Sequence, residues 1–230
     1  MDIDNIQIGP KPCKVGVYGR PGLLLVQPSA RHEEKADGLC REMETIKRGC
    51  ADGLAMVAFD CGNWAQALMP WQDAAVSNDP EVGRHAHDTL RYVEQELLPW
   101  LRSRYGNLPC IIGGYSLGGL FALWAARESY SFEAVAAASP SLWIDKWTDY
   151  AQTHPVHAKS VYLSLGDREE HCRNKRMKAI GNCVRDEHRR LCVQLEASRT
   201  VLEWNRGGHF GEEAERTARA FGWCIENIGK

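Results

Sequence analysis

Short apolar runs alternate with longer, helix-like segments along most of this chain. The runs 14–18, 23–26 and 54–59 are mainly apolar and are closed by Gly, Pro, Asn or Asp, a pattern typical of buried strands. Later segments show the same pattern, at 110–114, 132–137, 161–165 and 201–204. These runs are the predicted strands.

The segments between the strands have helical periodicity. The clearest predicted helix runs from Asp79 to about Tyr105, with Asp79 as its N-cap and Pro80 as its first residue. Its apolar residues recur every three or four positions, at Val82, Ala86, Leu90, Val93, Leu97 and Leu101. We expect Pro99 to kink this helix or end it early. Further helices are predicted over 117–128, 174–197 and 212–227. The alternation predicts an α/β fold with a mostly parallel central sheet flanked by helices.

Length and charge narrow the class of protein. The 230 residues contain 44% hydrophobic and 25% charged residues, which fits a single globular domain over residues 1–230. The net charge of −2 argues against a nucleic-acid partner, which would need a basic face, and against docking to an acidic membrane. A small, neutral partner fits this balance better.

The N-terminus, the length of the apolar stretches and the cysteines indicate where in the cell the protein is expected. The N-terminus has no basic-then-apolar signal pattern, and no apolar stretch reaches the roughly 20 residues that cross a bilayer. Nine cysteines are scattered without framework spacing, which suits reduced thiols better than a disulfide scaffold. We therefore expect a cytoplasmic protein with no membrane partner.

The strongest chemical signal is a G-x-S-x-G pattern, centred on Ser116, between a predicted strand and a predicted helix. Segment 166–170 and His209 also follow predicted strands. In an open α/β sheet, the loops beyond the carboxyl ends of the strands converge on one crevice. The order serine, acid, histidine is that of a nucleophile, its orienting acid and its base in α/β-hydrolases.

Four segments carry a resemblance to a known family: GGYSLGGL at 113–120, ASPSLW at 138–143, LSLGDREE at 163–170 and WNRGGHF at 204–210. With them the chain resembles the α/β-hydrolase superfamily, in the "putative esterase" branch that includes esterase D and enterochelin esterase-like proteins. The resemblance implies an α/β-hydrolase fold over nearly the whole chain and a serine esterase acting on a small-molecule ester. The short stretch between Trp143 and Ser160 leaves little or no room for a cap domain.

Catalytic roles follow from this chemistry. Ser116 would attack the ester and form an acyl-enzyme, with His209 as base and then acid. In similar proteins the acid lies three residues after the glycine that ends its strand, which implies Glu169. Asp167 is the alternative, and Glu170 is also near.

The tetrahedral intermediate needs N–H donors. The first should be the backbone of Leu117, directly after the nucleophile. The resemblance places the second near Ser29, with Ala30 as the alternative.

Trp71 and Trp143 are candidates for substrate binding, as part of a set with Trp64 and Trp147 in segments that can rim the crevice; core packing explains any one of them equally well. A metal site is not predicted, because no paired C-x-x-C accompanies His188 and Cys192. No cofactor is predicted either, because no phosphate-binding glycine pattern follows a strand.

Two other functions share these features. An acyltransferase or thioesterase would use the same three residues with a different acceptor or leaving group. A non-catalytic binding protein could also be built on the same scaffold.

Overall fold

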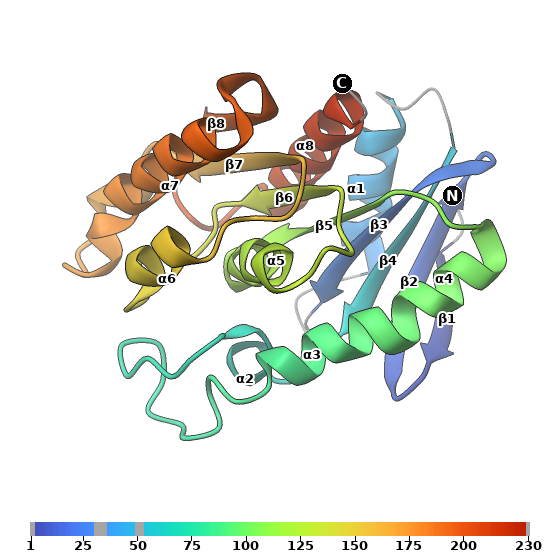
Figure 1. Cartoon of the computed structure of the whole chain (residues 1–230), viewed down its shortest axis with the longest axis horizontal. Coiled ribbons are helices and arrows are strands. Elements are labelled where there is room, and N and C mark those ends of the chain that lie inside the picture. Colours follow the sequence, from blue (N-terminus) through green and yellow to red (C-terminus); the bar gives the residue numbers. More distant parts are fainter. Residues whose placement is uncertain (1–2, 30–35, 49–52, 229–230) are drawn as a thin grey trace.

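The computed structural model describes residues 3–29, 36–48 and 53–228, and its strands form one mixed sheet (Figure 1). The strands are β1 (Ile3–Ile8), β2 (Lys11–Tyr18), β3 (Pro21–Ser29), β4 (Gly53–Asp60), β5 (Cys110–Tyr115), β6 (Ala134–Ala138), β7 (Ser160–Gly166) and β8 (Thr200–Asn205). Their order in the sheet is β1-β2-β4-β3-β5-β6-β7-β8. β1 and β2 pair antiparallel, and so do β2 and β4, whereas every pair from β4 to β8 is parallel. The predicted α/β class with a mostly parallel sheet is confirmed.

Helices cover both faces of this sheet. They are α1 (Ala36–Lys47), α2 (Trp64–Leu68), α3 (Ala86–Tyr92), α4 (Leu98–Tyr105), α5 (Leu117–Glu128), α6 (Trp147–Thr153), α7 (Ile180–Leu195) and α8 (Glu213–Asn227). α1 and α8 lie together on one face, while α3, α4 and α5 lie on the other (Figure 1). The segment 139–159, all of it described, contributes only the short helix α6.

The core consists of two layers, one on each face of the sheet. In β3, Leu24 and Val26 face the layer under α3 to α7, whereas Leu25 faces the layer under α1 and α8. All three side chains are fully buried. Because successive strand residues point to opposite faces, a strand covered on both sides is apolar throughout. This is why the inner strands were recognisable as continuous apolar runs.

The long predicted helix begins later than its periodicity suggested. Asp79 does not cap it; its carboxylate accepts hydrogen bonds from the Glu81 backbone (3.0 Å) and from the Gln66 side chain (2.7 Å). Gly83 then has φ +87°, which a right-handed helix cannot contain. The helix therefore starts at Ala86.

Pro99 does not end the helix. A π-helical turn at Val93–Leu97 joins α3 to α4, and Pro99 lies in the first turn of α4. This turn widens the helix where the proline ring would otherwise meet the carbonyl four residues earlier. The helix thus continues to Tyr105, as its apolar periodicity predicted.

Candidate active site

Ser116 lies at a strained turn between β5 and α5. Its backbone has φ 56° and ψ −118°, a conformation that glycine adopts readily and other residues rarely. A Cβ at Gly114 would lie 2.9 Å from the carbonyl carbon of Gly118, and a Cβ at Gly118 would lie 3.2 Å from Pro28. Close packing therefore favours glycine at both positions of the pattern, and the turn presents Ser116 at the cleft beyond the sheet.

The structure brings three of the predicted side chains together. The Ser116 Oγ lies 3.0 Å from the His209 Nε2, and the His209 Nδ1 lies 2.7 Å from the Glu169 Oε2. These residues follow β5, β8 and β7, whose parallel pairing puts their carboxyl ends at one edge. An imidazole that donates its Nδ1 proton to the carboxylate keeps a lone pair on Nε2 for the serine proton.

The neighbouring carboxylates face other partners. Asp167, the alternative acid, accepts a hydrogen bond from the Gly207 backbone at 2.8 Å. Glu170 accepts two hydrogen bonds from the Arg185 guanidinium, each of 2.9 Å. Among the three carboxylates of segment 166–170, it is therefore Glu169 that contacts the imidazole.

The second oxygen of Glu169 is held by three donors. Its Oε1 accepts hydrogen bonds from the Gly166 backbone (2.7 Å), the Ser139 hydroxyl (2.9 Å) and the Arg216 guanidinium (3.3 Å). Burial alone would raise the pKa of Glu169, but the contact with His209, together with those of Gly166 and Ser139, lowers this pKa below the usual glutamate range. Glu169 is therefore an anion at neutral pH and can stabilise a protonated imidazole.

Four polar contacts at the site involve residues that sequence reasoning did not single out. The Ser141 hydroxyl lies 3.2 Å from the Ser116 Oγ, and the Tyr115 hydroxyl donates to the His209 backbone carbonyl at 2.6 Å. Ser139 and Arg216 both contact Glu169. Ser139 and Ser141 belong to the segment ASPSLW, which contributed to the family resemblance but suggested no role for either residue. Tyr115 occupies a variable position of G-x-S-x-G. Arg216 lies in α8, where no motif marks it.

A cleft of about 1040 Å³ opens onto Ser116 and His209. Its apolar lining includes Trp64, Trp143, Met177, Ile180 and Phe210. Trp143 thus lines the cleft, as its candidate role requires. Trp71 does not: its indole N–H donates to the Asp145 carbonyl, and its ring stacks on Trp147 in the core.

The predicted oxyanion donors lie at the same cleft. Leu117 is the first residue of α5, so its N–H is among those that have no partner within the helix. Ser29 is the last residue of β3, and it lines the cleft together with Ser116 and Leu117. Ala30, the alternative donor, lies outside the described residues.

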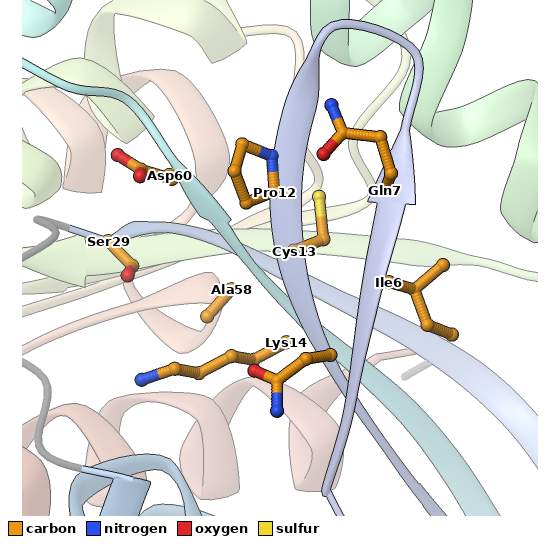
Figure 2. Close-up of a pocket in the computed structure, with 9 residues that line it drawn as sticks. Ile6, Gln7, Pro12, Cys13, Lys14, Ser29, Ala58 and Asp60 are labelled. Carbon is orange, nitrogen blue, oxygen red and sulfur yellow. The ribbon is translucent and has the colours of Figure 1, made fainter.

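A smaller cavity of about 390 Å³ lies beside Ser29, between the β1–β2 hairpin and the ends of β3 and β4 (Figure 2). Its potential nucleophile is Cys13, whose thiol contacts the Tyr92 hydroxyl at 3.3 Å. Burial raises the pKa of this thiol, and the thiolate is the reactive form. Cys13 is therefore a poor nucleophile, and the contacts among Ser116, His209 and Glu169 lie at the larger cleft.

Two further sequence expectations concern metals and membranes. Within residues 3–29, 36–48 and 53–228, no three His, Cys, Asp or Glu residues are placed to hold a metal ion. His188 and Cys192 contact each other at 3.6 Å on one face of α7. No described helix is both long enough and apolar enough to span a membrane.

The sheet order and the Ser116–His209–Glu169 contacts define the class of α/β-hydrolases. The family described as "Putative esterase" matches residues 34–209, and the chain belongs to this family. It is accordingly a carboxylic ester hydrolase, which confirms the family and the enzyme class predicted from the sequence.

Solved structures agree with this fold. The siderophore hydrolases EstA and EstB from Aspergillus nidulans are 17% and 16% identical to the chain, with TM-scores of 0.70 and 0.72. The matches cover 97% and 100% of this chain and 94% and 96% of theirs. The enterobactin esterase FES from Shigella flexneri is 18% identical with a TM-score of 0.68; the match covers 98% of this chain and 59% of that enzyme. A comparison with curated protein sequences gives no match.

Proposed function

We propose that this enzyme hydrolyses a small carboxylic ester through an acyl-enzyme on Ser116, with His209 as general base and Glu169 as the orienting acid. One observation carries the proposal: the Ser116 Oγ lies 3.0 Å from the His209 Nε2, while the His209 Nδ1 lies 2.7 Å from Glu169. A serine hydroxyl is a weak nucleophile until a neighbouring base takes its proton. This geometry supplies that base and the carboxylate that orients it.

The reaction proceeds in two halves. His209 accepts the Ser116 proton as the Oγ attacks the ester carbonyl carbon, and the carbonyl oxygen becomes an oxyanion. The N–H groups of Leu117 and Ser29 are the proposed donors to this oxyanion. When the C–O bond breaks, His209 gives its proton to the departing alcohol. Water then attacks the acyl carbon while His209 takes its proton. The bond between the acyl carbon and the Ser116 Oγ breaks, His209 returns the proton to this Oγ, and the acid is released.

The cleft supports an ester with a flat or apolar group. Trp64 and Trp143 line it, and Phe210, directly after His209, is 88% exposed at its rim. Aromatic side chains with exposed surface can bury that surface when a ligand enters. We propose that the bound ester places such a group against these rings.

Labelling with a fluorophosphonate, followed by intact-mass measurement, tests the nucleophile. We expect one adduct on the wild type and none on Ser116→Ala, because the reagent needs an activated hydroxyl. His209→Ala should lose the adduct as well, since its hydroxyl lacks a base. A wild type that remains unlabelled would favour the non-catalytic scaffold.

A matched pair of substitutions tests the acid. Glu169→Gln should reduce ester turnover strongly because it removes the charge beside His209. Asp167→Asn removes a charge two residues away whose partner is the Gly207 backbone, and it should leave turnover near the wild-type value. The reverse result would assign the role to Asp167.

Hydrolysis and acyl transfer use the same acyl-enzyme, so product partition separates them. With a simple aryl ester, adding an alcohol should leave the free acid as the main product of a hydrolase. A predominant new ester at modest alcohol concentration would instead identify an acyltransferase.

A further inference from the structure

Arg216 is an unusual residue for its position in the fold. It lies in α8 with only 1% of its surface exposed, and burying a guanidinium is costly unless a carboxylate and hydrogen bonds compensate. Within the described part of the chain, its ion pair is with Glu169 at 3.3 Å. The arginine and the imidazole of His209 therefore share one carboxylate.

The same guanidinium also reaches the second anchor of His209. The Arg216 Nη1 donates to the Tyr115 hydroxyl at 3.1 Å, and that hydroxyl donates to the His209 carbonyl at 2.6 Å. The Nη2 donates to the Arg206 carbonyl at 3.2 Å, three residues before His209. Arg216 thus supports the ring of His209 through Glu169, and the main chain of His209 through Tyr115.

We propose that Arg216 is a positioning residue for the hydrolysis proposed above, on which this inference rests. It fixes Glu169 and the loop of His209 in a single hydrogen-bonded cluster, in which the positive guanidinium contacts one oxygen of Glu169 and the imidazole contacts the other. Arg216 does not line the cleft, so it acts through Glu169 and Tyr115 and makes no contact with the substrate.

The charge argument depends on what else surrounds the imidazole. Glu169 and the Tyr115 hydroxyl contact His209 directly, and burial raises the pKa of Tyr115 so that it stays a neutral donor. The remaining charged groups line the cleft or lie in the loop after β7, namely Arg41, Glu42, Asp167, Arg168, Glu212, Glu213 and Glu215. All of these except Glu42 are exposed or half-buried, where solvent weakens their influence. Glu42 is buried, and its carboxylate accepts a hydrogen bond from the Gln27 side chain at 2.7 Å. The buried Arg216 is the cation least screened from the Glu169–His209 pair.

Removing the charge should change the rate constant and the pH profile but not substrate binding. We expect Arg216→Met to lower kcat for p-nitrophenyl acetate by about 10–100-fold, by analogy with the loss caused by removing the hydrogen-bonded partner of a metal-binding side chain. KM should stay near the wild-type value. The acidic limb of the kcat/KM profile should move to higher pH, because the imidazolium is then no longer opposed by a second cation.

Two further variants separate the contribution of the Arg216 charge from that of its hydrogen bonds. Arg216→Lys keeps the charge but lacks the planar fork, so it should restore the acidic limb while recovering only part of kcat. Tyr115→Phe removes the contact to the His209 carbonyl and keeps the charge; it should lower kcat without moving the acidic limb. Rates are expressed per active site, titrated with the fluorophosphonate, so that loss of folded enzyme does not count as loss of activity.

Arg127→Met is the matched control. Arg127 is another buried arginine, paired with Glu187 away from the cleft, and its loss should reduce stability but not kcat per titrated site. The inference is overturned if Arg216→Met sites have the wild-type kcat and pH profile, or if Arg127→Met produces the same changes. If Arg216→Met does not fold, wild-type kcat per site in both Arg216→Lys and Tyr115→Phe overturns it. Absence of a Ser116 adduct on the wild type would instead refute the proposed function itself.

Discussion

Replacing Ser116 by glycine and, separately, by alanine should reveal the backbone strain at the nucleophile. Both variants lose the hydroxyl and its contacts to His209 and Ser141, so these losses cancel in the comparison. The variants differ only in the Cβ carried at φ 56° and ψ −118°. Such a conformation costs a residue with a side chain about 1–3 kcal/mol, a cost that glycine avoids.

The comparison needs a reference site, because glycine also makes the unfolded chain more flexible. Ser103 is exposed in the second half of α4, where glycine should be about 1 kcal/mol less stable than alanine. The glycine-minus-alanine difference in unfolding free energy should therefore be about 1–3 kcal/mol more favourable at Ser116 than at Ser103. For a chain of this size, each 1 kcal/mol corresponds to roughly 2–4 °C in Tm.

Equilibrium urea unfolding of the four variants, followed by tryptophan fluorescence, measures this difference. The slopes with denaturant should agree among the variants, so that the midpoints report stability alone. Equal glycine-minus-alanine differences at the two sites would refute the reasoning, since they would mean that the turn stores no strain in Ser116.

Other predictions concern stability elsewhere in the chain. Gly83→Ala should cost more than about 1 kcal/mol in urea unfolding, because φ is +87° and the new Cβ would lie 2.1 Å from the Gln72 nitrogen. Asp73→Asn should cost about 1–3 kcal/mol, because the buried carboxylate loses its ion pair of 2.7 Å with Arg176; a cost near zero would contradict that role. The lowered pKa of Glu169 means that its charge stabilises the fold above the unfolded-state pKa of about 4.3 and that this contribution is lost as pH falls through the folded-state pKa. The stability gap between wild type and Glu169→Gln should accordingly be larger at pH 7 than at pH 3, and a gap that is independent of pH would exclude the charge as its source.

The fold was predictable from sequence wherever burial dominates the pattern. β3 and β5 are buried on both faces and appear as continuous apolar runs. The edge strand β1 is largely exposed, so its sequence lacks such a run and it was not predicted. The start of α3 was predicted wrongly for a different reason. The apolar spacing includes Val82, but the backbone conformation at Gly83 excludes this part of the chain from the helix.

The site was predictable as far as strand ends and chain order determine it. Ser116 and His209 are marked by glycine-rich segments after strands, and the parallel sheet brings these segments together. Spacing alone could not separate Asp167, Glu169 and Glu170, because they lie within four residues and each has a hydrogen-bonded partner of its own. The choice depends on the 3-10 turn at Glu169–His171, which directs Glu169 inward.

The periodicity of α8 places an arginine on the buried face of the helix, although no sequence motif marks this residue. Its buried face follows helical spacing through Arg216, Ala220 and Cys224, with Thr217 and Phe221 beside them. An arginine in such a stripe cannot point to solvent, and an unpaired charge in the core would destabilise the fold. The pattern therefore predicts a buried carboxylate opposite α8. Of the three acids after β7, Glu169 is the one that is buried, and it forms the ion pair with Arg216, so the structure supplies the carboxylate that this pattern requires.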